Sequence, residues 1–233
     1  MVHPKQLIVE GTDDLSAISN LVQQHIDGFK NGRDYLVEMK SGDGVENILV
    51  DRYIRNELSQ ARLQAIGFVI DADDAPQEHW QSFRNFVAKY YENVPENLPA
   101  DGLILEQEGK PRLGFWMMPD CRAKGMLEDF LRLMVPGHDA DKLWLHARTV
   151  TEVAKKEHGA PYIDAHKVKA EIHTWLAWQN EPGKRFGAAL AAKILDPNAE
   201  SARPFLCWFA QLFQLPLLSA PSGDGAGAAD ARA

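Results

Sequence analysis

The chain has 233 residues, a formal net charge of -8, 45% hydrophobic residues and 25% charged residues. This composition is ordinary for a soluble globular protein, and the length allows a sizeable core. No apolar run approaches the roughly 20 residues that a membrane span needs, and a general nucleic-acid-coating protein would carry a basic excess. Cys121 and Cys207 lack metal-ligand spacing. We therefore expect two reduced thiols in a cytoplasmic protein.

Three strand-then-helix units are predicted in succession at the start of the chain. The strands are expected over residues 6–10, 35–39 and 66–70. A helix follows each strand, with Thr12 as the cap of the first, a second carrying Val45 to Tyr53, and a third starting near Pro76. This order predicts parallel strands joined by right-handed crossovers in an α/β fold.

The rest of the chain changes from strands to helices. Residues 93–100 are expected to form a connection, and strands over 102–106 and 113–117 either form an edge hairpin or extend the parallel sheet. Helices are then predicted over 127–134, 140–157, 164–179, 185–193 and 200–213. We therefore expect an α/β domain over 1–120, a helical extension packed on it over 121–215, and a disordered tail over 216–233 that lacks large apolar groups.

Acidic residues gather where two predicted buried strands end. Glu10 ends the first strand, with Asp14 shortly after it, and Asp71, Asp73 and Asp74 follow the third strand. In open α/β sheets, sites form at the carboxyl ends of the strands. Two unit charges about 4 Å apart repel by roughly 4 kcal/mol at an effective dielectric constant of 20, so such acids need a cation, a basic partner or a raised pKa. Oxygen ligands suit Mg²⁺, and the pattern predicts a site for Mg²⁺ or Mn²⁺.

The same acids also have a purely structural interpretation. Asp74, three residues before Gln77, fits an ordinary helix cap. Asp13 and Asp14 fit the first turn of a helix, where the dipole favours negative charge. Glu10 is harder to explain in this way, because it is a lone acid that ends a buried strand before a glycine.

Two motifs in the first half of the chain resemble the signature motifs of TOPRIM domains. They read Val9-Glu10-Gly11-Thr12-Asp13-Asp14 and Phe68-Val69-Ile70-Asp71-Ala72-Asp73. This family covers topoisomerases, bacterial primases, small ribonucleases that mature ribosomal RNA, and OLD-type nucleases. The resemblance implies an α/β sandwich with a mainly parallel sheet, with Glu10 as general acid/base and Asp71 and Asp73 as Mg²⁺ ligands. Under this hypothesis Glu10 can alternatively bind a second ion, and Asp14 and Asp74 are outer candidates for the metal site.

Three further segments resemble signatures of a group of small stand-alone bacterial TOPRIM-like proteins, a resemblance that implies no particular activity. They read Trp116-Met117-Met118-Pro119-Asp120, Gly125-Met126-Leu127-Glu128-Asp129-Phe130 and His173-Thr174-Trp175-Leu176-Ala177-Trp178-Gln179. The chain departs from topoisomerases and primases because it has neither a zinc-binding Cys cluster nor a strand-passage domain. A nuclease is the member of the family that we expect.

A second group of charged residues follows the last predicted strand. Asp120 with Arg122 and Lys124 forms a second-tier site, in which the bases could hold a phosphate. Glu128 is a further second-tier acid. Its spacing of four residues from Lys124 favours a surface ion pair over a metal role.

The helical half offers only weak candidates. Lys184 and Arg185 precede a predicted helix and either hold a phosphate or belong to a simple loop. His166 and His173 share one helical face, with Lys169 beside them, and a solvated or packed helix surface is the favoured interpretation.

Together with the metal site predicted from the acids, the resemblance to TOPRIM domains implies a Mg²⁺- or Mn²⁺-dependent phosphoryl-transfer enzyme, a nuclease acting on DNA or RNA. The alternatives are a non-catalytic interaction module and a hydrolase of small phosphate esters. OLD proteins carry an ABC-type ATPase, and this chain has no G-x-x-x-x-G-K-[ST] loop. The partners considered are therefore the nucleic-acid substrate, a separate ABC-type ATPase subunit in a phage-defence role, and a second copy in a homodimer, with no membrane partner.

Overall fold

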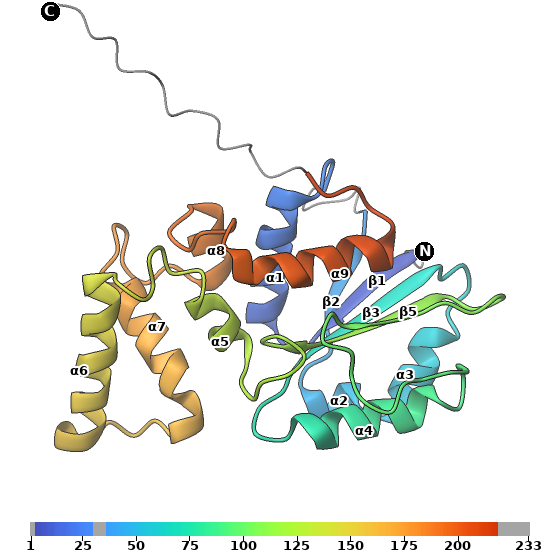
Figure 1. The fold of residues 1–233 in the computed structure, drawn as a ribbon, viewed down its shortest axis with the longest axis horizontal. Coiled ribbons are helices and arrows are strands. Elements are labelled where there is room, and N and C mark those ends of the chain that lie inside the picture. The colour runs from blue at the N-terminus through green and yellow to red at the C-terminus, as the bar shows by residue number, and fades with distance from the viewer. Residues whose placement is uncertain (1–2, 30–35, 219–233) are drawn as a thin grey trace, which may run out of the picture.

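A five-stranded sheet forms the centre of the computed structural model, which describes residues 3–29 and 36–218 (Figure 1). The strand order is β2-β1-β3-β5-β4. The strands are β1 (Lys5–Val9), β2 (Glu38–Ser41), β3 (Ala65–Asp71), β4 (Leu103–Leu105) and β5 (Arg112–Met118). All neighbouring pairs are parallel except β4 and β5, which confirms the predicted α/β fold with a mainly parallel sheet.

Helices cover both faces of the sheet and extend beyond one of its ends (Figure 1). One face carries α1 (Thr12–His25) and α9 (Arg203–Phe213), and the other carries α2 (Val45–Ile48), α3 (Asp51–Leu58) and α4 (Pro76–Val87). The remaining α-helices are α5 (Leu127–Arg132), α6 (Lys142–His158), α7 (Lys167–Ala177) and α8 (Phe186–Ala191), with 3-10 turns at Asp164–His166 and Glu200–Ala202. The helical C-terminal half is thus confirmed.

The side chains on the two faces of the sheet explain which helix each face accepts. Gly67 and Gly114 are register partners, and a Cβ atom on either would lie 2.8 Å or 2.5 Å from Leu212 of α9. The next pair, Phe68 and Phe115, points to the opposite face, because successive side chains of a strand alternate. There both rings contact Phe83 of α4, with centroid distances of 5.5 Å and 4.1 Å. Glycines let α9 approach the sheet closely, whereas one edge-to-face and one stacked ring contact hold α4.

The two late strands combine both arrangements that the sequence left open. β5 pairs in parallel with β3 from Ala65↔Arg112 to Asp71↔Met118, and β4 returns antiparallel along β5. The hairpin therefore supplies both a fourth parallel strand and an antiparallel edge.

Several predicted boundaries were wrong in detail. The N-cap of α1 is Gly11, not Thr12, and the helix expected from Val45 to Tyr53 is two short helices. No helix in the described ranges is long and apolar enough to cross a membrane. The boundary at residue 120 remains a prediction, and all but the first three residues of the predicted tail lie outside the described ranges.

Candidate functional site

A cavity of about 480 Å³ opens where the parallel strands end. Its walls come from the β1–α1, β2–α2 and β3–α4 connections, from the start of α5, and from the start of α7 with the turn before it. The acidic lining residues are Glu10, Asp13, Asp14, Asp43, Asp71, Asp73 and Glu128. The structure therefore brings together five predicted site residues around one space, namely Glu10, Asp14, Asp71, Asp73 and the second-tier acid Glu128.

Asp71 connects three elements of this cavity. Its backbone N–H donates a hydrogen bond to Glu10 Oε2 over 3.0 Å, so the first residue after β1 meets the last residue of β3. Its own Oδ1 accepts a hydrogen bond from the backbone N–H of Leu127, the first residue of α5, at 2.9 Å. The juxtaposition of Glu10 and Asp71 follows from the parallel register of β1 and β3, which pairs Val9 with Val69.

Asp14 is the most buried acid contributed by the β1–α1 connection. It is 8% exposed, and its Oδ2 accepts a hydrogen bond from the backbone N–H of Gly11 at 3.2 Å. Its Oδ1 has no hydrogen-bond partner within the described part of the chain. Burial, followed by the charge of Glu10 and a smaller contribution from Glu128, raises the pKa of Asp14 to about 7. An orphaned oxygen of this kind is the feature that a cation would satisfy.

Like charges oppose ionisation elsewhere in the cavity. Burial first, and then the charges of Asp14, Glu10 and Glu128, raise the pKa of Asp71 to about 9. The pKa of Glu10 is raised by its burial, although the hydrogen bond from Asp71 acts in the opposite direction. The cavity therefore concentrates more negative charge than its protein surroundings neutralise.

Asp73 is held at the cavity by a backbone bridge. Its N–H donates to the carbonyl oxygen of Gly125 at 2.8 Å, and its own carbonyl oxygen accepts from the N–H of Gly125 at 3.0 Å. Asp73 has a φ of 48°, and Gly125 has a φ of 135°. A Cβ atom on Gly125 would lie 2.6 Å from Asp129 Oδ2, so glycine is required here. The bridge ties the loop after β3 to the segment that leads into α5.

Glu128 lies in the cavity, so the predicted surface ion pair with Lys124 is wrong. The Glu128 side chain is 4% exposed, and its Oε1 lies 2.8 Å from Lys169 Nζ of α7. Lys124 instead lies 3.7 Å from Asp74 on the surface. The i,i+4 argument failed because α5 begins only at Leu127, and Lys124 precedes the helix.

Basic groups reach the cavity from α7 and the turn before it. Burial alone would lower the pKa of Lys169, but the hydrogen bond and charge of Glu128 outweigh it, and the pKa is raised. His166 also lines the cavity, whereas His173 packs against the ring of Phe186 at 4.8 Å. His166 is exposed, so the favoured interpretation of a solvated surface holds for it, although that surface borders the cavity. No local pattern signals these positions, because they depend on how α7 packs against α5.

A third strand end contributes residues that the sequence reasoning overlooked. Ser41 ends β2, and its Oγ lies 2.9 Å from Asp43 Oδ1. Both residues line the cavity. The signal was present, since β2 was predicted as a parallel strand and its end should share the edge with β1 and β3.

The remaining candidates do not belong to the cavity. Asp120 Oδ1 accepts hydrogen bonds from the N–H groups of Arg122 and Ala123 at 3.0 Å and 2.7 Å, so it closes its own turn. Lys184 pairs with Glu181. In the described ranges, the lining omits Asp74, Asp120, Arg122, Lys124, Lys184 and Arg185.

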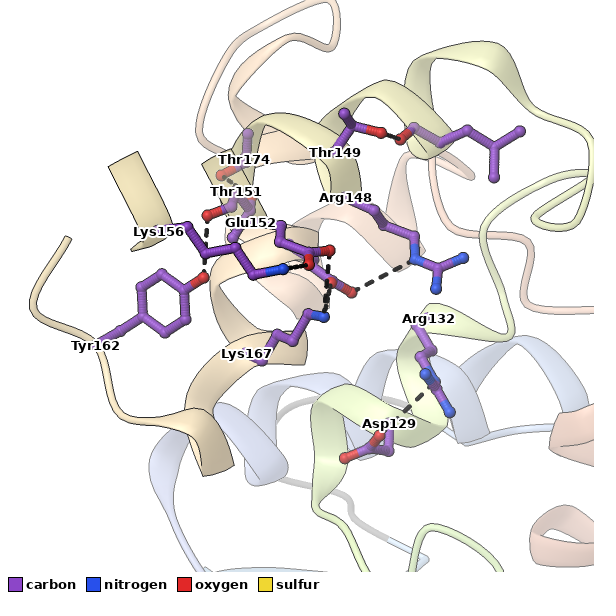
Figure 2. A network of polar contacts seen from close by, with 12 residues as sticks. Asp129, Arg132, Arg148, Thr149, Thr151, Glu152, Lys156, Tyr162, Lys167 and Thr174 are labelled. Atoms are coloured by element: carbon purple, nitrogen blue, oxygen red, sulfur yellow. Dashed lines mark hydrogen bonds and ion pairs between the residues drawn. The ribbon is translucent and has the colours of Figure 1, made fainter. Parts of the chain in front are cut away.

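The helix that carries Lys169 is fastened to α6 by polar contacts (Figure 2). The hydroxyls of Thr151 in α6 and Thr174 in α7 lie 3.3 Å apart, and the hydroxyl of Tyr162, in the connection between the helices, donates to the carbonyl oxygen of Thr151 at 3.0 Å. Lys167 lies 3.8 Å from Glu152. These contacts hold the two helices together and keep the backbone at Lys169 in place.

The residues present fit a hard divalent cation. No group of three or more His, Cys, Asp or Glu side chains is close enough to form a complete metal cage within the described ranges. Mg²⁺ usually needs only one or two carboxylates and completes its shell with waters and substrate phosphates. The cavity offers such carboxylates, among them the unpartnered Oδ1 of Asp14.

The fold and cavity together define an α/β protein with an acidic site at the carboxyl edge of a mainly parallel sheet. Residues 4–214 match the model of a family described as "Protein of unknown function (DUF3226)". The chain belongs to this family. Comparison with the curated proteins and with the solved structures found no match.

Proposed function

We propose that this protein is a Mg²⁺- or Mn²⁺-dependent phosphoryl-transfer enzyme with a TOPRIM-like site, a nuclease acting on DNA or RNA. The supporting observation is the contact between Glu10 and Asp71, whose strands end side by side beside a cavity that Asp14 and Asp73 also line. Strand ends of a parallel sheet are where such folds place their ligands.

Asp71 and Asp73 are the residues that would hold the ion, and Asp14 lines the same cavity as an outer candidate. When bound, a divalent cation of this type polarises a phosphoryl oxygen and makes a water molecule more acidic. Asp71 and Asp14 have raised pKa values in the metal-free cavity. A bound cation favours their ionised forms and removes most of the cost of clustering them.

Glu10 is suited to move the proton. One of its oxygens is fixed by the backbone N–H of Asp71, which orients the carboxyl group, and its burial raises its pKa. A carboxylate with a raised pKa accepts a proton from an attacking water more readily, and afterwards can return it to the leaving oxygen.

A nuclease panel tests this proposal directly. Plasmid DNA, single-stranded DNA and structured RNA are incubated with the protein in Mn²⁺, and cleavage is followed on gels. Asp71→Asn should lower the rate at least about 100-fold, a loss typical of removing a group that stabilises transition-state charge. Asp74→Asn is the matched control, because Asp74 belongs to the same acidic run but is exposed and lies outside the cavity. Cleavage that survives Glu10→Ala and Asp71→Ala would come from a contaminant and would contradict the nuclease proposal.

Thermal melting tests the metal separately from catalysis. At 100 times its dissociation constant, Mn²⁺ should stabilise the wild type by about 2.7 kcal/mol. Asp74→Asn should gain the same amount and Asp71→Asn much less. Equal gains in wild type and Asp71→Asn would show that the assigned site is wrong. Metal binding without nucleic-acid cleavage would favour the non-catalytic module, unless a small phosphate ester is hydrolysed in the same buffer.

A further inference from the structure

The ion pair between Lys169 and Glu128 lies beside the most buried acids of the cavity. Glu128 is 3% exposed and Asp14 is 8% exposed. Glu128 directly follows Leu127, whose N–H donates to Asp71 Oδ1 at 2.9 Å, and Glu128, Asp71 and Asp14 line the same cavity. Asp14 Oδ1 lacks a partner in the described part of the chain. The inner end of the cavity therefore has an unmet requirement for positive charge.

Lys169 supplies the positive charge that the protein itself places there. Among the lining residues within the described ranges, only Lys169 and His166 carry basic side chains, against seven acids. The Lys169 ammonium lies 2.8 Å from Glu128 Oε1, while its side chain is 44% exposed, so the long stem reaches inward from α7. The contacts between α6 and α7 shown in Figure 2 fix the backbone that carries it.

We propose that Lys169 is a built-in counter-ion of the cavity, and that it competes with the divalent cation for the carboxylate of Glu128. This inference rests on the proposed function, because it assumes that the cavity accepts such a cation. It adds Glu128 to the residues that favour the ion and assigns Lys169 an opposing role.

The competition has a simple physical basis. Two positive charges at one carboxylate repel each other, so entry of a divalent ion weakens the Lys169–Glu128 pair, and the pair in turn weakens ion binding. Because Lys169 is partly exposed, its side chain can rotate away from Glu128 without unfolding α7. The released ammonium is then free to pair with a substrate phosphate.

Calorimetric titration of Mn²⁺ into the full-length protein tests the competition. Lys169→Met removes the competing charge and should bind Mn²⁺ about fivefold more tightly than wild type, as expected for loss of a like charge close to the ion. Lys169→Arg keeps the charge and should stay within about twofold of wild type. Lys167→Met is the matched control, because Lys167 belongs to the same helix but pairs with Glu152 outside the cavity, and its affinity should not change.

A second measurement needs no substitution and avoids any loss of folding in Lys169→Met. Brief acetylation of the wild type, followed by mass spectrometry, reports how freely each lysine reacts. Mn²⁺ should increase the acetylation of Lys169 and leave that of Lys167 unchanged.

The outcomes separate this inference from the proposed function. If wild type binds Mn²⁺ but Lys169→Met binds it equally or more weakly, or if Lys169 acetylation does not respond to Mn²⁺, the competition is overturned and the proposed metal site stands. If neither wild type nor Lys169→Met binds Mn²⁺, both are overturned. If Lys169→Met binds Mn²⁺ and wild type does not, Lys169 excludes the ion from the wild-type cavity, and the competition is supported.

Discussion

Asp71 shows how a single carboxyl group can be predicted from sequence while its environment cannot. Its place at the end of a buried strand was enough to mark it as a site residue. Its neighbours Asp14, Glu10 and Glu128 come from elements far apart in the chain, and their charges, added to burial, raise its pKa to about 9. In the folded, metal-free protein the carboxyl group of Asp71 therefore favours its protonated form at pH values below about 9.

This raised pKa gives a signed prediction for the metal-free protein. The folded state holds the Asp71 proton up to pH about 9, whereas an unfolded aspartate releases it near pH 4. The stability contributed by Asp71 is therefore fully present below about pH 4 and is lost as the pH rises toward 9. Asp71→Asn keeps the oxygen that accepts the Leu127 N–H, and it should raise the melting temperature in EDTA at pH 8 by about 3 °C or more, with a smaller gain at pH 5.5.

Asp74→Asn serves as the control for this measurement and should show no such pH-dependent gain. A lower melting temperature for Asp71→Asn at pH 8 than for wild type would contradict the assignment of charge crowding at Asp71.

At the scale of elements, the contact between α9 and the sheet depends on two glycines. Gly67 and Gly114 lie side by side in β3 and β5. A Cβ atom on Gly114 would lie 2.5 Å from Leu212 Cδ2 and 3.0 Å from Trp208 Cζ2. α9 can therefore approach the sheet closely only because Gly67 and Gly114 have no side chains. The sequence predicted both strands and the helix, but it did not predict that they touch.

We predict that Gly114→Ala destabilises the protein by about 1–3 kcal/mol, because the added methyl group overpacks the α9 interface. Leu212→Ala removes the two atoms that lie closest to the added methyl group, and in this background Gly114→Ala should cost at least about 1 kcal/mol less. Urea unfolding of the four proteins in the cycle measures the coupling. Additive losses would show that α9 does not lie against Gly114.

At the scale of the molecule, the C-terminal half covers part of one face of the sheet and completes the cavity that the N-terminal half forms. α9 covers β3 and β5, where Trp116 packs against Trp208 at a centroid distance of 5.7 Å. The same half supplies Glu128 and Lys169 to the cavity. In this protein the last helix lies on the sheet, while α5 and α7 supply residues to the site.

Truncation tests this dependence and the predicted division of the chain. A fragment of residues 1–120 would expose the apolar sheet face that α9 covers, so it should lack a cooperative thermal transition and bind the dye ANS. A chain ending at Leu218 should melt cooperatively, close to the full-length protein. Cooperative folding of the 1–120 fragment would establish it as an autonomous domain and contradict this expectation.

The sequence by itself determined the order of strands and helices and the principal acids at the strand ends. Apolar runs, helix-starting residues and the acids after β1 and β3 are local features, and the carboxyl ends of parallel strands necessarily share one edge of a sheet. Glu10, Asp71 and Asp73 could therefore be placed together without coordinates.

Tertiary structure alone decided the other wall of the cavity. Glu128 faces inward because Asp71 Oδ1 accepts a hydrogen bond from the N–H of Leu127, the first residue of α5. Lys169 reaches Glu128 only because α7 packs against α5. Side-chain burial and ion pairing between elements depend on how helices pack, and sequence spacing within one helix carries no information about a partner from another. For this reason the sequence predicted Glu10, Asp71 and Asp73 as site residues but not Lys169, which pairs with Glu128.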